Sequence, residues 1–213
     1  MENLIKEMTE AGVVPVVKID NADDAVSLAV ALRKGGINCA EITFRTDAAE
    51  ESIKRISAEF PDMLIIAGTV LTPRQADKAI AAGAKAIVSP GLNPMVVKHC
   101  IEKDYPVVPG VCTPSEVEQA MSLGLSYLKF FPAEAAGGVK MIKAMAAPYT
   151  GIRFMPTGGI NVSNLADYLN CKAVFACGGS WMVPSDKIAA GKFDEIEKLT
   201  AEAAALLKEV RKQ

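Results

Sequence analysis

Lys129 is the residue best suited to covalent chemistry, because it stands in the middle of the apolar run SYLKFF (126–131). Burial disfavours the charged ammonium relative to the neutral amine, and the neutral amine is the form that attacks a carbonyl carbon. Lys129 is therefore predicted to be a nucleophile that forms a Schiff base. The alternative is a lysine whose stem packs in the core while its amine reaches a carboxylate or the surface.

Glu41 is the expected companion of this lysine, because it interrupts the apolar run CAEITF (39–44). In a strand, alternation with a period of two places Glu41, Thr43 and Arg45 on one face. If that face lines a cavity, the carboxylate can move protons and the guanidinium can bind a substrate carboxylate. A buried Glu41–Arg45 ion pair is the structural alternative.

Two glycine-rich turns could bind an anion. The sequences TGG (157–159) and GGS (178–180) each end an apolar run. Glycine lets backbone N–H groups approach phosphate oxygens, and a following helix N-terminus adds a favourable partial charge. Together the turns predict a phosphate site, and simple turns are the alternative.

Other polar residues give weaker signals. Thr69 follows the run MLIIAG (63–68) and could donate a hydrogen bond to a carboxylate, or it could serve as a helix-capping hydroxyl ahead of Thr72. His99, the single histidine, falls on an expected helix and is interpreted as a solvated or structural side chain. Neither a histidine or thiolate metal site nor a Ser/His pair is expected, although an all-carboxylate metal site stays open.

Eight short apolar runs alternate with amphipathic segments and would position these residues. The runs are 13–18, 39–44, 63–68, 85–90, 105–110, 126–131, 153–159 and 173–179. Continuous apolar runs are typical of parallel strands buried on both faces, and each such strand needs a crossover before the next. Eight units favour a (β/α)₈ (TIM) barrel over an open doubly wound sheet.

The segments between the runs predict helices, several of which begin near Asp, Asn or Thr and end at Gly. They are 21–35, 47–59, 72–83, 94–103, 114–124 and 161–169, with an extra N-terminal helix at 2–11 and a last barrel helix at 193–212. Because chemistry in such a barrel sits at the carboxyl ends of the strands, polar residues late in a run carry the most weight.

Composition indicates a single domain over residues 1–213. The formal net charge of −2, with dispersed Lys and Arg, argues against a nucleic-acid partner. No apolar run reaches the ~18 residues of a membrane span, and the start of the chain lacks an export signal. Five cysteines, none of them in a CxxC pair, predict reduced thiols and a cytoplasmic location.

Eight motifs together resemble the aldolases that act on 2-keto-3-deoxy-6-phosphogluconate (KDPG) and 4-hydroxy-2-oxoglutarate (KHG). The motifs are VVPVVK, AEITFRT, AGTVLTP, IVSPGLNP, PGVCTPSE, LKFFPAE, PTGGI and CGGSW. The resemblance implies a class I aldolase that releases pyruvate together with glyceraldehyde 3-phosphate or glyoxylate. It also implies a homotrimer with no metal and no cofactor, since the covalent imine forms on Lys129 itself.

Residue roles are carried over from the same resemblance. It implies that Lys129 is the Schiff-base lysine and that Glu41 is the general acid/base. The implied substrate contacts, which hold the pyruvyl carboxylate or shape the pocket around it, are Arg45, Thr69, Pro90 and Phe131. The implied phosphate contacts are Gly158, Gly159, Gly179 and Ser180.

Lys18 departs from the family pattern, since many members carry arginine at the end of the first strand. Lysine lacks the bidentate fork, which leaves a substrate contact from this position in doubt and makes Lys18 the rival nucleophile. Three other functions stay open. They are an aldolase for 2-keto-3-deoxy-6-phosphogalactonate, a non-catalytic phosphate-metabolite-binding barrel, and a barrel isomerase or decarboxylase without an imine.

Overall fold

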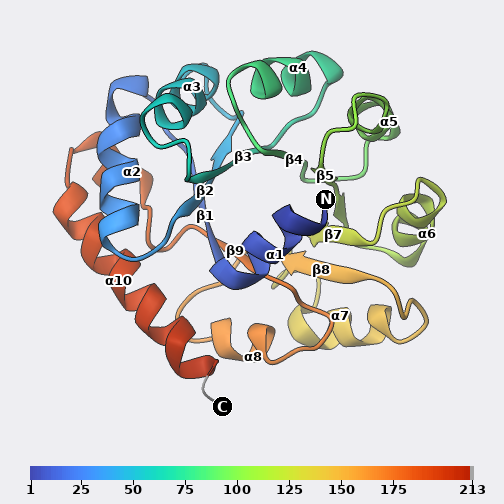
Figure 1. Cartoon of the computed structure of the whole chain (residues 1–213). Coiled ribbons are helices and arrows are strands. Elements are labelled where there is room, and N and C mark those ends of the chain that lie inside the picture. Colours follow the sequence, from blue (N-terminus) through green and yellow to red (C-terminus); the bar gives the residue numbers. More distant parts are fainter. Residues whose placement is uncertain (212–213) are drawn as a thin grey trace.

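Parallel strands alternate with helices in the computed structural model, which describes residues 1–211 (Figure 1). Lys212, the last residue of the expected C-terminal helix, lies outside the described residues. The strands are β1 (Val13–Val17), β2 (Cys39–Thr43), β3 (Leu64–Gly68), β4 (Ala86–Val88), β5 (Val107–Val108), β6 (Gly110–Val111), β7 (Tyr127–Phe130), β8 (Arg153–Pro156) and β9 (Cys177–Gly179). The helices are α1 (Glu2–Ala11), the short 3₁₀ helix η1 (Ala22–Asp24), α2 (Ala25–Lys34), α3 (Ala49–Glu59), α4 (Pro73–Ala81), α5 (Pro94–Glu102), α6 (Pro114–Ser122), α7 (Gly138–Ala146), α8 (Leu165–Leu169), α9 (Ser185–Ala189) and α10 (Phe193–Val210).

The hydrogen-bonded ladders form two parallel sheets. One is six-stranded, in the order β5-β4-β3-β2-β1-β9, and the other is three-stranded, in the order β6-β7-β8. The α/β class with parallel strands is therefore confirmed, but one continuous ladder of eight strands is not what the structure forms. Pro109 separates β5 from β6 because proline has no N–H to donate. At the other seam two isolated bridges join the chain around β8 to the chain around β9, Phe154–Val174 ahead of β9 and Thr157–Gly178 just after β8.

Polar caps and prolines fix where several helices start. Thr72 accepts a hydrogen bond from Gln75 N, and Thr113 forms a reciprocal capping box with Glu116. A proline follows each of these caps in the first turn of the helix, where its missing N–H costs nothing. The helices α7 and α9 were not expected, and neither begins with a side-chain cap.

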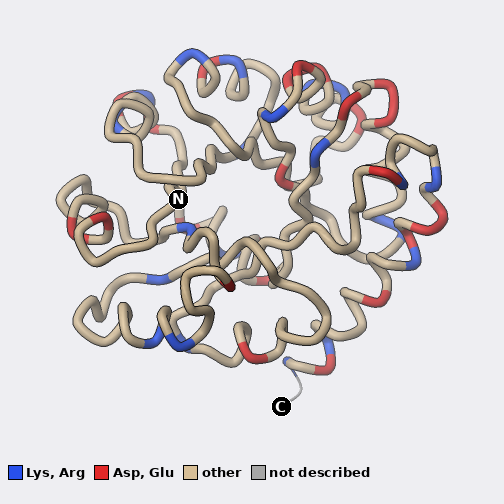
Figure 2. Tube along the Cα trace, turned by 180° about the vertical axis from the view of Figure 1, so that it is seen from behind, with Lys and Arg blue, Asp and Glu red and all other residues tan. Residues whose placement is uncertain are grey.

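The strands are apolar and buried, whereas charge is carried by the surrounding helices and loops. Every residue of β2 and β3 is buried, which matches their near-continuous apolar sequences. Seen from behind, Lys, Arg, Asp and Glu lie mainly along the outer helices (Figure 2). A buried charged residue on a strand therefore stands out against its surroundings.

The expected N-terminal helix is confirmed as α1, which lies across the amino-terminal ends of the strands (Figure 1). Its start borders Val107 and Leu125, and its end borders Cys39 and Leu64. Arg211, which follows α10, donates hydrogen bonds to the carbonyl oxygens of Thr9 and Glu10. This leaves the carboxyl ends of the strands as the end where a ligand can enter.

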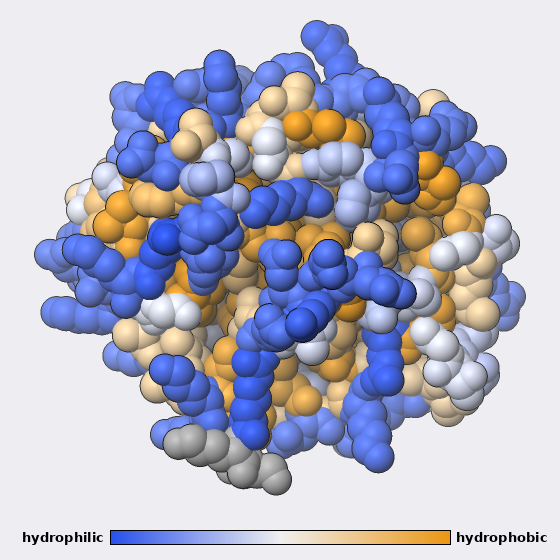
Figure 3. All heavy atoms as spheres, viewed as in Figure 1, coloured by the Kyte–Doolittle hydropathy of each residue, from blue (hydrophilic) through white to orange (hydrophobic). Residues whose placement is uncertain are grey.

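The face on which α1 lies is largely hydrophilic, with apolar residues visible between the polar ones (Figure 3). None of the helices within residues 1–211 is long and apolar enough to cross a membrane.

Candidate active site

A cavity of about 270 Å³ lies at the carboxyl ends of the strands. Its walls contain all ten residues to which the sequence analysis assigned a catalytic, substrate-binding or phosphate-binding role. They are Lys129, Glu41, Arg45, Thr69, Pro90, Phe131, Gly158, Gly159, Gly179 and Ser180. The structure thus brings together residues that lie on or just after six different strands.

Lys129 and Glu41 form a buried pair at the floor of this cavity. Lys129 Nζ lies 3.0 Å from Glu41 Oε1, and the two side chains are 5% and 0% exposed. The amine does reach a carboxylate, as the structural alternative foresaw, but it does so inside the cavity. The expected alternative of a Glu41–Arg45 ion pair is wrong, because Glu41 turns to Lys129 instead.

The position of Glu41 depends on a glycine of the neighbouring strand. A β-carbon on Gly68, the last residue of β3, would lie 2.2 Å from Glu41 Oε1. The carboxylate therefore fills space that any other residue at position 68 would occupy. Its second oxygen, Oε2, is buried and has no hydrogen-bond partner among the described residues. Such an oxygen is available to a bound ligand.

Arg45 is held at the rim of the cavity through its own strand. Its Nε donates to Thr43 Oγ1 at 3.0 Å, and the Thr43 hydroxyl donates to Val17 O at 2.7 Å. Only Nε of Arg45 is used in this chain of hydrogen bonds, and its two terminal guanidinium nitrogens have no partner among residues 1–211. Phe131 lies nearby, with Lys129 Nζ 5.7 Å from its ring centroid.

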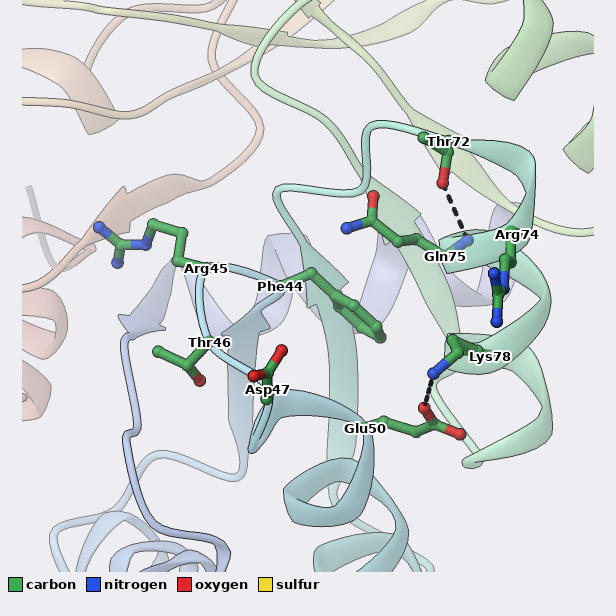
Figure 4. A pocket seen from close by; sticks show the side chains of 9 residues that line it. All are labelled: Phe44, Arg45, Thr46, Asp47, Glu50, Thr72, Arg74, Gln75 and Lys78. Atoms are coloured by element: carbon green, nitrogen blue, oxygen red, sulfur yellow. Dashed lines mark hydrogen bonds and ion pairs between the residues drawn. The ribbon is translucent and has the colours of Figure 1, made fainter.

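Arg45 also borders a second cavity, of about 320 Å³, between the starts of α3 and α4. In Figure 4 its guanidinium extends away from the Lys78–Glu50 ion pair on the far wall of that cavity. The second cavity includes neither Lys129 nor Glu41. Arg45 is thus the wall that the two cavities share.

Thr69 adopts a backbone conformation that a β-branched residue rarely takes. Its φ angle is 56°, in the left-handed region. The alternative role of Thr69 as a helix cap is wrong, because Thr72 caps α4. A strained residue that lines a cavity is a functional candidate, since residues with this kind of backbone strain cluster at active sites and ligand-binding sites.

The two glycine turns require glycine for different reasons. Gly158 and Gly159 have φ angles of 101° and 83°, which other residues adopt only with strain. Gly178 and Gly179 instead provide room: a β-carbon would lie 2.4 Å from Thr157 Oγ1 at the first position and 1.9 Å from the Trp181 ring at the second. The turns meet at the Thr157–Gly178 bridge.

Other residues of the cavity were missed or placed only in part. Thr157 and Gly178 belong to the two turns but had no assigned role, although the buried Thr157 Oγ1 has no partner in the described part of the chain. The place of Thr157 at the end of a strand is a signal that could have found it. Val16 and Ile160 give no such signal, because apolar residues that line a cavity cannot be told from hydrophobic-core residues in the sequence.

Two further candidates lie outside the cavity. Lys18 Nζ is 2.7 Å from both carboxylate oxygens of Asp20, so the rival nucleophile is engaged elsewhere. His99 on α5 pairs with Asp77 at 2.8 Å, which fits the expected structural or solvated role.

The thiols are poorly suited to act as nucleophiles. Burial raises the pKa of Cys39 to about 12 and the pKa of Cys177 well above its usual range. Within residues 1–211, His, Cys, Asp and Glu side chains do not gather in threes where they could hold a metal ion.

Comparison with known proteins places this site in a family. The family model for KDPG and KHG aldolase matches residues 4–199. The chain belongs to this family. The resemblance inferred from the eight motifs is thereby confirmed.

Aldolases of this family resemble the chain over nearly its whole length. The 2-dehydro-3-deoxy-phosphogluconate aldolase of Treponema pallidum (strain Nichols) is 48% identical over 207 residues, 97% of this chain and 99% of that protein. The KHG/KDPG aldolase of Escherichia coli (strain K12) is 45% identical over 196 residues, 92% of each chain. The KDPG aldolase of Legionella pneumophila, solved with pyruvate captured as a covalent carbinolamine intermediate, has a TM-score of 0.90 and 38% identity, covering 93% of this chain and 97% of that one.

Proposed function

We propose that this chain is a class I aldolase that cleaves KDPG to pyruvate and glyceraldehyde 3-phosphate, and KHG to pyruvate and glyoxylate. The observation that carries the proposal is the buried Lys129–Glu41 pair, 3.0 Å apart, in a cavity rimmed by two glycine turns. Membership of the KDPG and KHG aldolase family supports the same activity.

The pair supplies the groups that imine formation needs. Transfer of a proton from Lys129 to Glu41 gives a neutral amine without leaving either charge unpaired in a buried site. The amine attacks the substrate C2 carbonyl to give a carbinolamine, and loss of water gives a protonated imine. No cofactor is required, because the electron sink is made from the lysine and the substrate.

Glu41 is also placed to take part in carbon–carbon cleavage. In the proposed step the carboxylate accepts the C4 hydroxyl proton as the C3–C4 bond breaks, and the bonding electrons move toward the imine nitrogen to give an enamine. Protonation of the enamine at C3 and hydrolysis of the imine then release pyruvate. The unpartnered Oε2 supports this role.

The two ends of the substrate would be bound by different residues of the cavity wall. Arg45 and Thr69 would bind the carboxylate of the pyruvyl portion, with Pro90 and Phe131 packing against it. Backbone N–H groups of the turns at Gly158, Gly159 and Gly179, together with the Ser180 hydroxyl, would bind the phosphate. This placement holds the scissile bond near Lys129 and Glu41.

We also infer that the two sheets close into one (β/α)₈ barrel, a single domain over residues 1–213. Only Pro109 separates β5 from β6, and the isolated bridges between β8 and the β9 segment support closure at the other seam. A homotrimer, a cytoplasmic location and the absence of a nucleic-acid partner remain expectations from the sequence and the family.

The decisive experiment is intact mass after incubation with pyruvate and borohydride, which reduces an imine to a stable amine. Wild type is compared with Lys129→Ala and with Lys18→Ala, followed by peptide mapping. We expect a pyruvyl-sized adduct on Lys129 that is lost in Lys129→Ala and kept in Lys18→Ala.

Folded wild-type protein without an adduct would overturn the Schiff-base mechanism and favour a barrel enzyme without an imine or a binding protein. If the adduct forms, steady-state cleavage of KDPG against 2-keto-3-deoxy-6-phosphogalactonate distinguishes the two aldolases that the sequence left open.

A further inference from the structure

A hydrogen-bonded pair that the proposed reaction does not use lies beside the turn at Gly158 and Gly159, and neither of its residues lines the cavity. The Tyr168 hydroxyl, from α8, donates to Glu134 Oε1. Tyr168 is 1% exposed and ranks among the largest fully buried side chains. Glu134 follows β7, the strand that carries Lys129.

Glu134 is tied to the turn by its backbone and by its side chain. Its N–H donates to Gly158 O at 3.0 Å, and the preceding Ala133 N–H donates to Thr157 O at 2.8 Å. A β-carbon on Gly159 would lie 2.6 Å from Glu134 Cγ and 2.7 Å from Glu134 Cβ. The Glu134 side chain therefore packs directly against the back of Gly159.

The opposite side of Gly159 is fixed as well. Its carbonyl oxygen accepts hydrogen bonds from the side-chain amides of Asn161 at 3.1 Å and Asn164 at 3.0 Å. The carbonyl of Gly159 is thus held in place within a turn that lines the cavity. Gly138 leaves room for the Tyr168–Glu134 pair, since a β-carbon there would lie 3.1 Å from Glu134 Oε1 and 3.2 Å from the Tyr168 hydroxyl oxygen.

The surroundings of the Glu134 carboxylate limit its repulsion of an anion bound at the turn. Burial and the Glu134 carboxylate raise the pKa of Tyr168, so the phenol keeps the proton that it donates. Its hydrogen bond engages Oε1 of Glu134, and the side chain reaches solvent in a cavity that Lys140 and Lys143 also line. Solvent and these two lysines therefore screen the carboxylate from the turn.

We propose that Tyr168 and Glu134 are positioning residues that hold the Gly158–Gly159 turn in its phosphate-binding shape and so determine the preference for phosphorylated 2-keto acids over short ones. The inference rests on the proposed function, because it assumes that the turn binds the substrate phosphate. KHG has no phosphate, so its cleavage needs the Lys129–Glu41 pair but not the shape of this turn.

The test compares KDPG and KHG cleavage by wild type, Tyr168→Phe, Glu134→Gln and Glu134→Ala. Tyr149→Phe is the matched control, because Tyr149 makes the same kind of hydrogen bond, to Glu118 at 2.8 Å, on the protein surface. We expect Tyr168→Phe and Glu134→Ala to raise KM for KDPG about three- to tenfold, the effect of losing one hydrogen bond. The kcat for KDPG and both constants for KHG should stay within about twofold of wild type.

Glu134→Gln should restore near-wild-type selectivity, because the amide oxygen can still accept from Tyr168 and the stem still packs on Gly159. An equal loss on both substrates, or no change on either, in the Tyr168→Phe and Glu134→Ala proteins would overturn the inference. That result is distinguishable from failure of the proposed function, in which wild type itself forms no adduct with pyruvate and borohydride.

Discussion

The carboxylate of Glu41 lies where a side chain at position 68 would be, since a β-carbon on Gly68 would come within 2.2 Å of Glu41 Oε1. The space beside Gly68 on β3 is thus filled by the carboxylate of Glu41, which lies on the neighbouring strand β2. The absence of a side chain on β3 is what allows an acid on β2 to reach Lys129 of β7.

Gly68→Ala should therefore displace Glu41 and lower kcat/KM by about 10²-fold or more, the usual contribution of a positioned acid/base. The pyruvate–borohydride adduct should still form on Lys129, although more slowly. Gly91→Ala is the control, because a β-carbon at Gly91 meets nothing within 4 Å. Equal activity of the two variants would show that Glu41 does not depend on the space at position 68.

Thr69→Gly should make the protein more stable and less able to bind its substrate. Relief of the left-handed backbone is expected to raise the free energy of unfolding by about 1 kcal/mol in urea titrations. Loss of the hydroxyl should raise KM for both keto acids. Asp104→Gly is a useful comparison, since Asp104 has a φ angle of 51° and lies outside the cavity. There we expect a smaller gain in stability, because Asp tolerates this conformation better, and unchanged kinetics.

The Lys129–Glu41 pair should show strong coupling in a double-mutant cycle. Lys129→Met or Glu41→Leu alone leaves an unpaired charge in a buried site and should cost about 3–5 kcal/mol of unfolding free energy. The double variant should recover most of that loss and be inactive. The measurement is urea unfolding of the four proteins at pH 7, and losses that simply add would contradict the coupling.

Acid should weaken the contact between α9 and α10. Hydrogen bonds from Lys187 and Lys192 hold the pKa of Glu195 below its usual range. A depressed carboxyl pKa stabilises the fold above the unfolded value, and this contribution is lost as the pH falls through the folded value. Glu195→Gln should therefore lower the urea midpoint at pH 7 slightly, and the difference should shrink and then vanish as the pH falls through the lowered pKa of Glu195. Glu202→Gln serves as the control, and a difference that persists at low pH would rule out the ion pair as its source.

The sequence predicted the strands well, because buried parallel strands read as apolar runs and their spacing is regular. It did not predict that Pro109 would divide the fifth run into two short strands belonging to different sheets. Nor did it predict α7. The N-cap residue of this helix is Gly137, which has a φ angle of 104° and no side chain that could cap the helix. The missing cap alone does not explain this, because α3 and α10 also lack a side-chain cap and were predicted.

The site was predictable wherever a polar residue interrupts an apolar run near the end of a strand. This rule found Lys129 and Glu41, and the ends of the runs and the glycine turns indicated the carboxylate and phosphate contacts. The family resemblance added Pro90 and Phe131, and all ten residues are among those that line the cavity. The rule could not find Val16 or Ile160, because apolar walls look like core. The Tyr168–Glu134 contact was also out of reach, since it joins residues on separate elements that no local pattern relates.

The helix α1 lies at the amino-terminal ends of the strands, whereas the proposed active site lies at their carboxyl ends. The contacts of α1, and the hydrogen bonds that Arg211 donates to Thr9 and Glu10, therefore lie at the end of the strands away from the cavity. Residues there can change without moving the groups proposed to touch substrate, and stability and chemistry in barrels of this kind are divided in the same way. Thermostability can therefore be engineered at the α1 end while substrate choice is redesigned at the other, and the two sets of substitutions should combine additively.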